Sequence, residues 1–199
     1  VSMYRIYSTL IEILAAAVFI VPIWCIYHKV YFHDWKRTIV SMIFGFYLTA
    51  IFAFVGFPTI RFLRIDFTVN IIPFVGMVSD YVNAWLNVLL FIPFGFFLPI
   101  LWSRFQNIKN IVLTGLIATC MIEISQIFTY RATDINDIIT NMIGTIIGYF
   151  IARWITNNFT KRILPGSSNS DFYVICGLVV LIMFFFQPFV SSMLWEMVL

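Results

Sequence analysis

Charged residues are scarce in this chain, and their scarcity excludes most soluble folds. Only 11% of the 199 residues are Asp, Glu, Lys or Arg, whereas 62% are hydrophobic. Soluble domains contain about 25% charged and about 45–50% apolar residues. The net charge of +3 is also too small to indicate nucleic-acid binding. The composition therefore predicts a single membrane domain that spans residues 1–199.

Cysteine and histidine are also rare, which excludes two common kinds of site. Cys25, Cys120 and Cys176 are isolated inside apolar segments, so their spacing indicates neither a disulfide framework nor a thiolate metal site. Both histidines, His28 and His33, lie in one short loop. The polar chemistry of the chain therefore rests on carboxylates, amides and a few arginines.

Long apolar segments are what the sequence has in abundance. A membrane-spanning helix needs about 20 mainly apolar residues. Six segments qualify: Ile6–Tyr27, Thr38–Phe57, Ala84–Trp102, Ile108–Phe128, Ile135–Thr156 and Phe172–Trp195. The predicted fold class is all-α, a polytopic membrane bundle of about six transmembrane helices.

The connection between the second and third helices, Pro58 to Asn83, is unusual. It is too apolar for a solvated loop and too polar for a span. A connection of this length inside a compact domain is usually functional or interfacial. We therefore predict an interfacial or re-entrant segment, with Arg61, Arg64 and Asp66 at the depth of the lipid headgroups.

The distribution of Lys and Arg predicts the orientation, because cytoplasmic loops carry an excess of them. The loops after the first, third and fifth helices hold eight of the twelve: Lys29, Lys36, Arg37, Arg104, Lys109, Arg153, Lys161 and Arg162. The opposite side holds Arg5, Arg61, Arg64 and Arg131. Both termini, and the turn between the fourth and fifth helices, are therefore predicted to be extracellular.

Three of the nine acidic residues fall within fifteen positions around that turn: Glu123, Asp134 and Asp137. On the fourth helix, Thr119, Glu123, Gln126 and Tyr130 share one stripe, and on the fifth Asp134, Asp137, Asn141, Gly144 and Gly148 share another. We expect the two stripes to face each other below Arg131. An ionisable residue below a membrane surface is costly, so Glu123 is a functional-site hypothesis by default.

Small and amide residues extend this constellation. Gly144 and Gly148 form a GxxxG motif, which lets a neighbouring helix approach closely. Because the turn is short, the fourth helix is the expected neighbour. Asn87, near the outer end of the third helix, is expected at the depth of Glu123 and Asn141.

Simpler interpretations stand beside the functional one. Asp134 and Asp137 fit an N-cap and an acidic first-turn residue of the fifth helix. Asn87 and Asn141 fit hydrogen bonds that hold membrane helices together. Glu123 is the hardest to explain structurally, because a glutamine would make the same interhelical contacts without a charge.

Four stretches resemble the signature blocks of the VanZ-like family, which takes its name from the teicoplanin-resistance protein of glycopeptide-resistance gene clusters. They are NVLLFIPFGFFLP (Asn87 to Pro99), EISQ (Glu123 to Gln126), RATDINDIITNMIGTIIG (Arg131 to Gly148) and, more weakly, the run from Asn70 to Phe74. Together they place a VanZ-like core at residues 70–154. The resemblance implies a bacterial multi-pass plasma-membrane protein that contributes to teicoplanin resistance, and it supplies no mechanism.

Three functions remain open from the residues alone. In the first, an outward polar pocket binds a membrane lipid, a lipid-linked cell-wall intermediate or a lipoglycopeptide through Asn87, Gln126, Arg131, Asp134 and Asn141. In the second, an intramembrane enzyme acts on a lipid or polyprenyl-phosphate headgroup with Glu123 and Asp137 as acid and base.

The third function, a transporter, is disfavoured because the inner helix halves carry almost nothing polar. Binding is preferred to catalysis because no convincing nucleophile lies at this face. The carboxylates permit a divalent cation, Mg²⁺ or Ca²⁺, without requiring one.

Overall fold

The structure is a computed structural model that describes residues 3–63, 65, 67–75, 77, 80–129, 132–159 and 169–198. The helices fall into two compact units, one formed by Val1–Leu63 with Ser170–Leu199 and the other by Arg64–Asn169. Six helical stretches of the described chain are long and apolar enough to cross a membrane: Tyr7–Phe32, Trp35–Val55, Tyr81–Leu101, Ile108–Gln126, Ile135–Thr156 and Ser170–Met197. The prediction of an all-α bundle with six spans is confirmed.

The first unit contains three of these spans. Helix α1 (Met3–Tyr27) continues into the π-helical turn η1 (His28–Phe32), and α2 (Trp35–Val55) follows after a short turn. The last span is built from α6 (Asn169–Leu181), the π-helical turn η3 (Ile182–Phe186) and α7 (Gln187–Val198). Continuous helix is the expected solution for a span, because the bilayer core offers no water to unpaired backbone groups.

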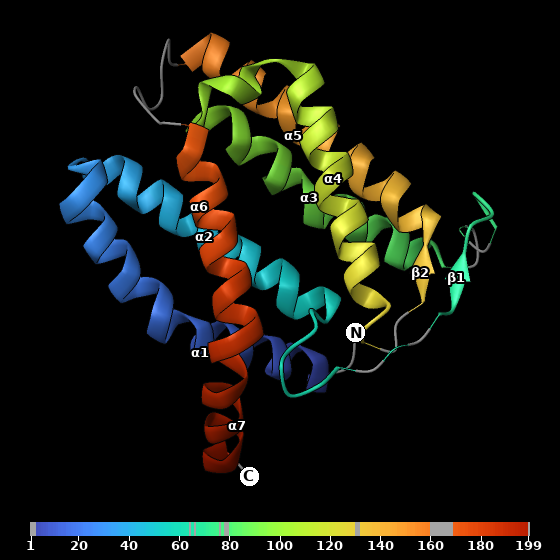
Figure 1. Ribbon diagram of the computed structural model, residues 1–199. Helices are drawn as coiled ribbons and strands as arrows, with labels where there is room; N and C mark the ends of the chain where they lie inside the picture. The colour runs from blue at the N-terminus through green and yellow to red at the C-terminus, as the bar shows by residue number, and fades with distance from the viewer. Residues whose placement is uncertain are drawn as a thin grey trace. The chain divides into compact units, whose positions relative to one another are not determined.

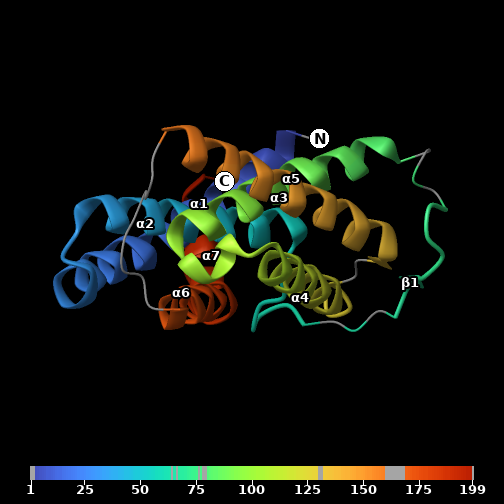
Figure 2. The same cartoon turned by 90° about the horizontal axis from the view of Figure 1, so that it is seen from above.

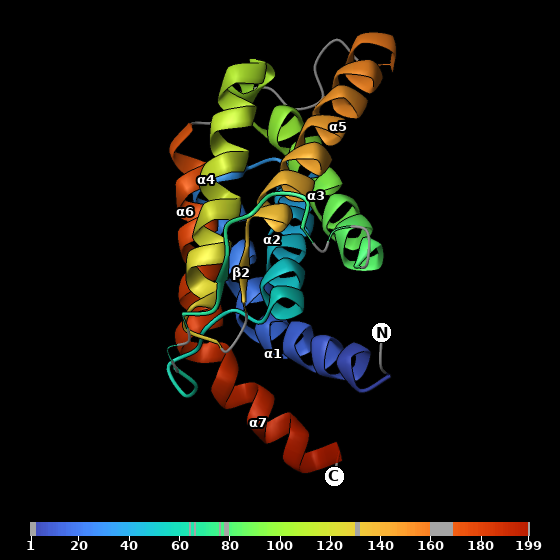
Figure 3. The same cartoon turned by 90° about the vertical axis from the view of Figure 1, so that its right-hand side faces the viewer.

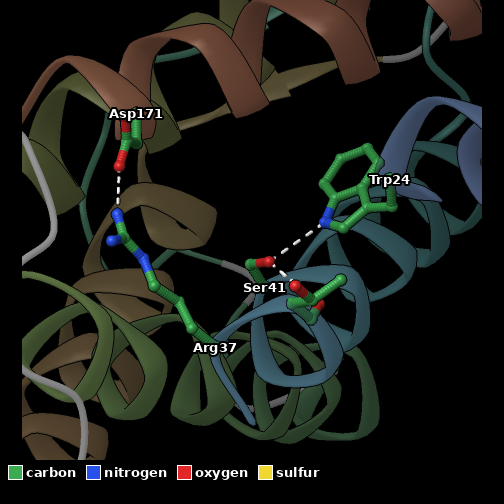
Figure 4. Close-up of polar contacts among 5 residues, drawn as sticks. Trp24, Arg37, Ser41 and Asp171 are labelled. Carbon is green, nitrogen blue, oxygen red and sulfur yellow. Dashed lines mark hydrogen bonds and ion pairs between the residues drawn. The ribbon is translucent and has the colours of Figure 1, made fainter. Parts of the chain in front are cut away.

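A buried tryptophan joins α1 to α2. The indole N–H of Trp24 donates to the hydroxyl of Ser41 over 3.1 Å, and Trp24 is almost fully buried (Figure 4). Gly45 leaves room for the ring, because a Cβ there would lie 2.9 Å from it. An indole N–H inside a membrane protein needs such a partner, so this hydrogen bond fixes how the two helices face each other.

An ion pair joins the first turn of α2 to that of α6. The Arg37 guanidinium contacts the Asp171 carboxylate (Figure 4), and both side chains are largely shielded from solvent. The same guanidinium lies 4.3 Å from the centre of the Phe32 ring. Residues 134 positions apart in the sequence are therefore tied together at this end of the unit.

The second unit holds the other three spans and the only two strands of the described chain. These elements are β1 (Val69–Asn70), α3 (Tyr81–Leu101), the 3₁₀ turn η2 (Ser103–Gln106), α4 (Ile108–Gln126), β2 (Thr133–Asp134) and α5 (Ile135–Phe159). The helices α3 and α5 run side by side, as Figures 1 and 2 show.

Glycines allow α3 and α5 to touch at the level of their backbones. A Cβ on Gly148 would lie 2.0 Å from the carbonyl oxygen of Ile92, and one on Gly144 would lie 2.2 Å from that of Val88. From the opposite side, a Cβ on Gly95 would lie 1.9 Å from the carbonyl oxygen of Thr145. No side chain fits at any of these three positions without moving a helix.

This contact corrects one expectation from the sequence. The GxxxG motif does bring a helix close, but the prediction that the fourth helix is that neighbour is wrong. Helix α4 meets α5 on another face, where Gly115 lies against the Thr145 side chain and Thr119 bonds Asn141. The motif indicates that a helix approaches closely, and it carries no information about which of two neighbouring apolar helices does so.

Candidate functional site

The candidate site lies where α4 ends, α5 begins and the connector from α2 to α3 returns to them. Strands β1 and β2 pair in parallel, with Val69 opposite Thr133 and Asn70 opposite Asp134. Figure 3 shows the connector passing beside β2 at the start of α5. The connector, for which the sequence predicts an interfacial or re-entrant segment, is thus bonded to the turn between α4 and α5.

Glu123 is the most deeply buried acid of the cluster, and it holds this turn in place. Its side chain is 2% exposed, and its Oε2 accepts the backbone N–H of Asp134 over 2.9 Å. Its backbone carbonyl accepts the hydroxyl of Thr133 over 3.0 Å. A hydrogen bond from an N–H to a carboxylate is among the stronger ones in proteins. The chain after α4 therefore folds back onto the last turn of that helix.

Asp134 contacts two segments through its carboxylate. Its Oδ1 accepts the backbone N–H of Asn136 over 2.8 Å, which is the bond of a helix N-cap. Both of its oxygens also lie 3.2 Å from the Asn70 side-chain nitrogen, which donates to them from β1. The N-cap interpretation thus describes one of the contacts of Asp134, and the link to the connector is the other.

Asn136 makes two hydrogen bonds to the backbone of the connector, a few residues after Asn70. Its Oδ1 accepts the backbone N–H of Phe74 over 2.7 Å, and its Nδ2 donates to the carbonyl of Val75 over 3.0 Å. The side chain is 6% exposed. Because an amide offers one acceptor and one donor, Asn136 satisfies two adjacent backbone groups that have no helix or sheet partner.

Two further amide oxygens of this region are buried. Gln126, the last residue of α4, is 5% exposed, and Asn141 on α5 is 3% exposed. The Asn141 Nδ2 donates to the Thr119 hydroxyl over 2.9 Å and so joins α4 to α5. However, no described group donates to the Oδ1 of Asn141 or to the Oε1 of Gln126. Buried acceptors without a donor are costly, and each one calls for a partner from water or a ligand.

The remaining predicted site residues are placed less centrally. Asp137 is half-buried in the first turn of α5. Asn87 is half-buried on α3, and its amide makes no hydrogen bond with the other described site residues. Arg131 lies outside the described residues. Within the described part of the chain, no three His, Cys, Asp or Glu side chains gather closely enough to hold a metal ion.

Asn136 and Thr133 are not among the site residues that the sequence predicts, and Asn70 is noted there only as the start of a weak family-like run. Asn136 lies off the stripe that Asp134, Asp137 and Asn141 form along α5, so helical spacing gave no reason to select it. The signal for Asn70 was the weak family-like run that starts there and ends at Phe74. Both asparagines act on the connector, and that pairing appears only in three dimensions.

The fold and this site define a class, namely a multi-pass helical membrane protein with a polar cluster at one end of three packed spans. The chain belongs to the VanZ/LLP1 family, whose sequence profile matches residues 39–156, more than half of its length. This match contains the core expected at 70–154 and extends it toward the N-terminus to include most of α2. No curated protein and no solved structure is significantly similar to the chain.

Proposed function

We propose that this protein is a bacterial plasma-membrane protein that contributes to glycopeptide resistance by binding an amphiphile of the cell envelope. The amphiphile is a membrane lipid, a lipid-linked cell-wall intermediate or a lipoglycopeptide such as teicoplanin. Membership of the VanZ/LLP1 family supports the link to resistance. The polar cluster formed by the end of α4, the start of α5 and β1 supports binding as the way in which the protein acts.

The observation that carries the proposal is the pair of buried amide oxygens on Gln126 and Asn141. Both are acceptors, and no described group donates to them. The neighbouring Glu123 and Asp134 carboxylates are acceptors as well. The cluster therefore favours a headgroup that is rich in hydroxyl or amide N–H donors. Sugars and peptides attached to a lipid supply such donors.

The charge distribution supports an outward orientation for this site. Eight of the twelve Lys and Arg residues fall in the loops that follow the first, third and fifth spans of the sequence, whereas the turn between α4 and α5 follows the fourth span. With those loops in the cytoplasm, the cluster faces the outer leaflet. Glycopeptides and lipid-linked wall intermediates meet at that leaflet, so the orientation matches the ligands proposed.

Glu123 distinguishes binding from catalysis. Its described bond is accepted by Oε2 from the Asp134 N–H, and a glutamine oxygen can accept the same bond. Glu123→Gln therefore keeps an acceptor for the Asp134 N–H and removes the charge. Glu123→Leu removes the acceptor and leaves the Asp134 N–H without its partner.

The experiment compares teicoplanin susceptibility in cells that carry the wild type, Glu123→Gln or Glu123→Leu at equal membrane abundance. Binding predicts that Glu123→Gln retains most of the resistance contribution and that Glu123→Leu loses it. The control is Glu12→Gln, because Glu12 is a carboxylate in a span of the other unit, outside the polar cluster, and accepts a hydrogen bond from Ser8 on α1. Complete loss in Glu123→Gln contradicts the binding proposal and favours the intramembrane enzyme with Glu123 and Asp137 as acid and base.

A further inference from the structure

Phe74 has a backbone conformation that its side chain does not favour. Its φ is +66°, and it is one of two non-glycine residues with positive φ in the described chain. A bulky residue in this region is a genuine outlier, because turns normally place glycine there. Such strain persists only where the surroundings enforce it, and an observed outlier is grounds for a functional hypothesis.

The surroundings that enforce it are polar and come from α5. Asn136 accepts the Phe74 N–H and donates to the Val75 carbonyl. The start of the same segment is held as well, because Asn70 pairs with Asp134 and its Oδ1 accepts the N–H of Ile72. Residues 70–75 are therefore held at the start by the side-chain pair Asn70–Asp134 and at the end by hydrogen bonds between Asn136 and the backbone.

The side chains of this fixed segment point away from the protein. Phe74 is 67% exposed, and Ile71, Ile72 and Val75 are also exposed. We call residues 71–75 the apolar knuckle. Through Asn70 it is joined to the polar cluster, because the Asn70 side chain donates to Asp134 and the Asp134 N–H donates to Glu123. A polar site and a rigid apolar projection only four residues apart match the two parts of an amphiphile.

We propose that the apolar knuckle docks the hydrocarbon chain of a lipid resident in the outer leaflet, whose headgroup donates hydrogen bonds to the polar cluster. This inference rests on the proposed function and adds the tail-binding surface to it. Asn136 is a positioning residue in this scheme, since it acts through the backbone of Phe74. Contact with bulk lipid alone does not explain the strain, because an exposed phenylalanine in an ordinary turn would meet bulk lipid equally well.

Photocrosslinking in native membranes tests this proposal with the full chain. Benzoylphenylalanine is placed at position 74 or, as a control, at position 67, where Phe67 is 76% exposed on the same connector outside the knuckle. After illumination, the lipids attached to the purified protein are identified by mass spectrometry. We expect one headgroup class to be enriched about tenfold at position 74 over position 67, the factor that corresponds to about one net hydrogen bond between that headgroup and the neighbouring polar cluster.

The same lipid composition at both positions overturns the docking surface, because Phe74 then faces the bulk bilayer. The proposed function would survive that result, since the Glu123 variants test it independently. Attachment of added teicoplanin at position 74 with no enriched lipid overturns the choice of a resident lipid. In the position 74 background, Asn136→Leu should abolish the enrichment, and Asn136→Asp, which keeps the acceptor for Phe74, should retain part of it.

Phe74→Gly separates a binding role from a structural one. Glycine adopts positive φ without strain, so this variant should be at least as stable as the wild type. The proposal predicts that it nevertheless loses the resistance contribution. A Phe74→Gly protein that keeps full resistance contradicts the role of the knuckle, because the ring that would contact the lipid chain is absent from it.

Discussion

Replacing Gly148 with alanine tests the contact between α3 and α5 with the smallest possible change. The added Cβ would lie 2.0 Å from the carbonyl oxygen of Ile92 and 2.8 Å from the backbone nitrogen of Phe96. Both are backbone atoms, so no rotamer change relieves the overlap, and the helices must separate. Overpacking of this kind typically costs about 1–3 kcal/mol.

Gly177 supplies the matched control for this measurement. It lies inside helix α6, and a Cβ there would meet nothing within 4 Å. Both substitutions gain the helix preference of alanine over glycine, which is worth about 1 kcal/mol. That gain cancels when the two alanine variants are compared. The difference between them therefore reports the overlap alone.

The assay is reversible unfolding in mixed detergent micelles, driven by SDS and followed by far-UV circular dichroism. Gly148→Ala should unfold with a free energy about 1–3 kcal/mol below that of Gly177→Ala. Gly115→Ala should fall between them, because its Cβ would meet the Thr145 side-chain methyl at 2.9 Å rather than a backbone atom. Equal stability of Gly148→Ala and Gly177→Ala would refute the backbone contact between α3 and α5.

Three further predictions concern the ends of the helices. Asp134→Ala should lower the free energy of unfolding by about 1 kcal/mol in the same assay, the typical cost of a lost N-cap; an unchanged value would contradict the cap at the start of α5. Arg37→Leu should lower the free energy of unfolding by about 1.5–3 kcal/mol, since it leaves the Asp171 carboxylate without its charged partner. The double variant Arg37→Leu with Asp171→Leu should recover part of that loss. A double variant less stable than Arg37→Leu alone would argue against the ion pair. In an otherwise cysteine-free chain, Ser103→Cys should react with a membrane-impermeant maleimide only after permeabilisation, whereas Ala132→Cys should react in intact cells; the reverse pattern would overturn the orientation.

The spans and the polar turn were predictable because their signals are local. Helix α4, for example, follows from about twenty mainly apolar residues, in which Glu123 is the one acidic residue. The cap on α5 follows from an aspartate just before the helix. Both features depend on residues that are neighbours in the sequence, so no knowledge of the tertiary structure is needed to find them.

The partners across the fold were not predictable in the same way. The GxxxG motif on α5 indicated a close neighbour, but α3 and α4 are both so apolar that neither presents a distinct face. The pairing of Asn70 with Asp134, and the grip of Asn136 on Phe74, join segments more than sixty positions apart. Helical periodicity describes one element at a time, so it does not detect such links.

Native mass spectrometry of the purified full chain tests the central claim most directly, because it identifies what the polar cluster binds. The protein is extracted from its own membranes in mild detergent, and the retained lipids are compared with the bulk lipid of the same cells. We predict that the wild type and Glu123→Gln retain one headgroup class rich in hydroxyl or amide donors, and that Glu123→Leu does not. Retained lipid that matches the bulk composition in all three proteins would contradict a ligand-binding site at this cluster.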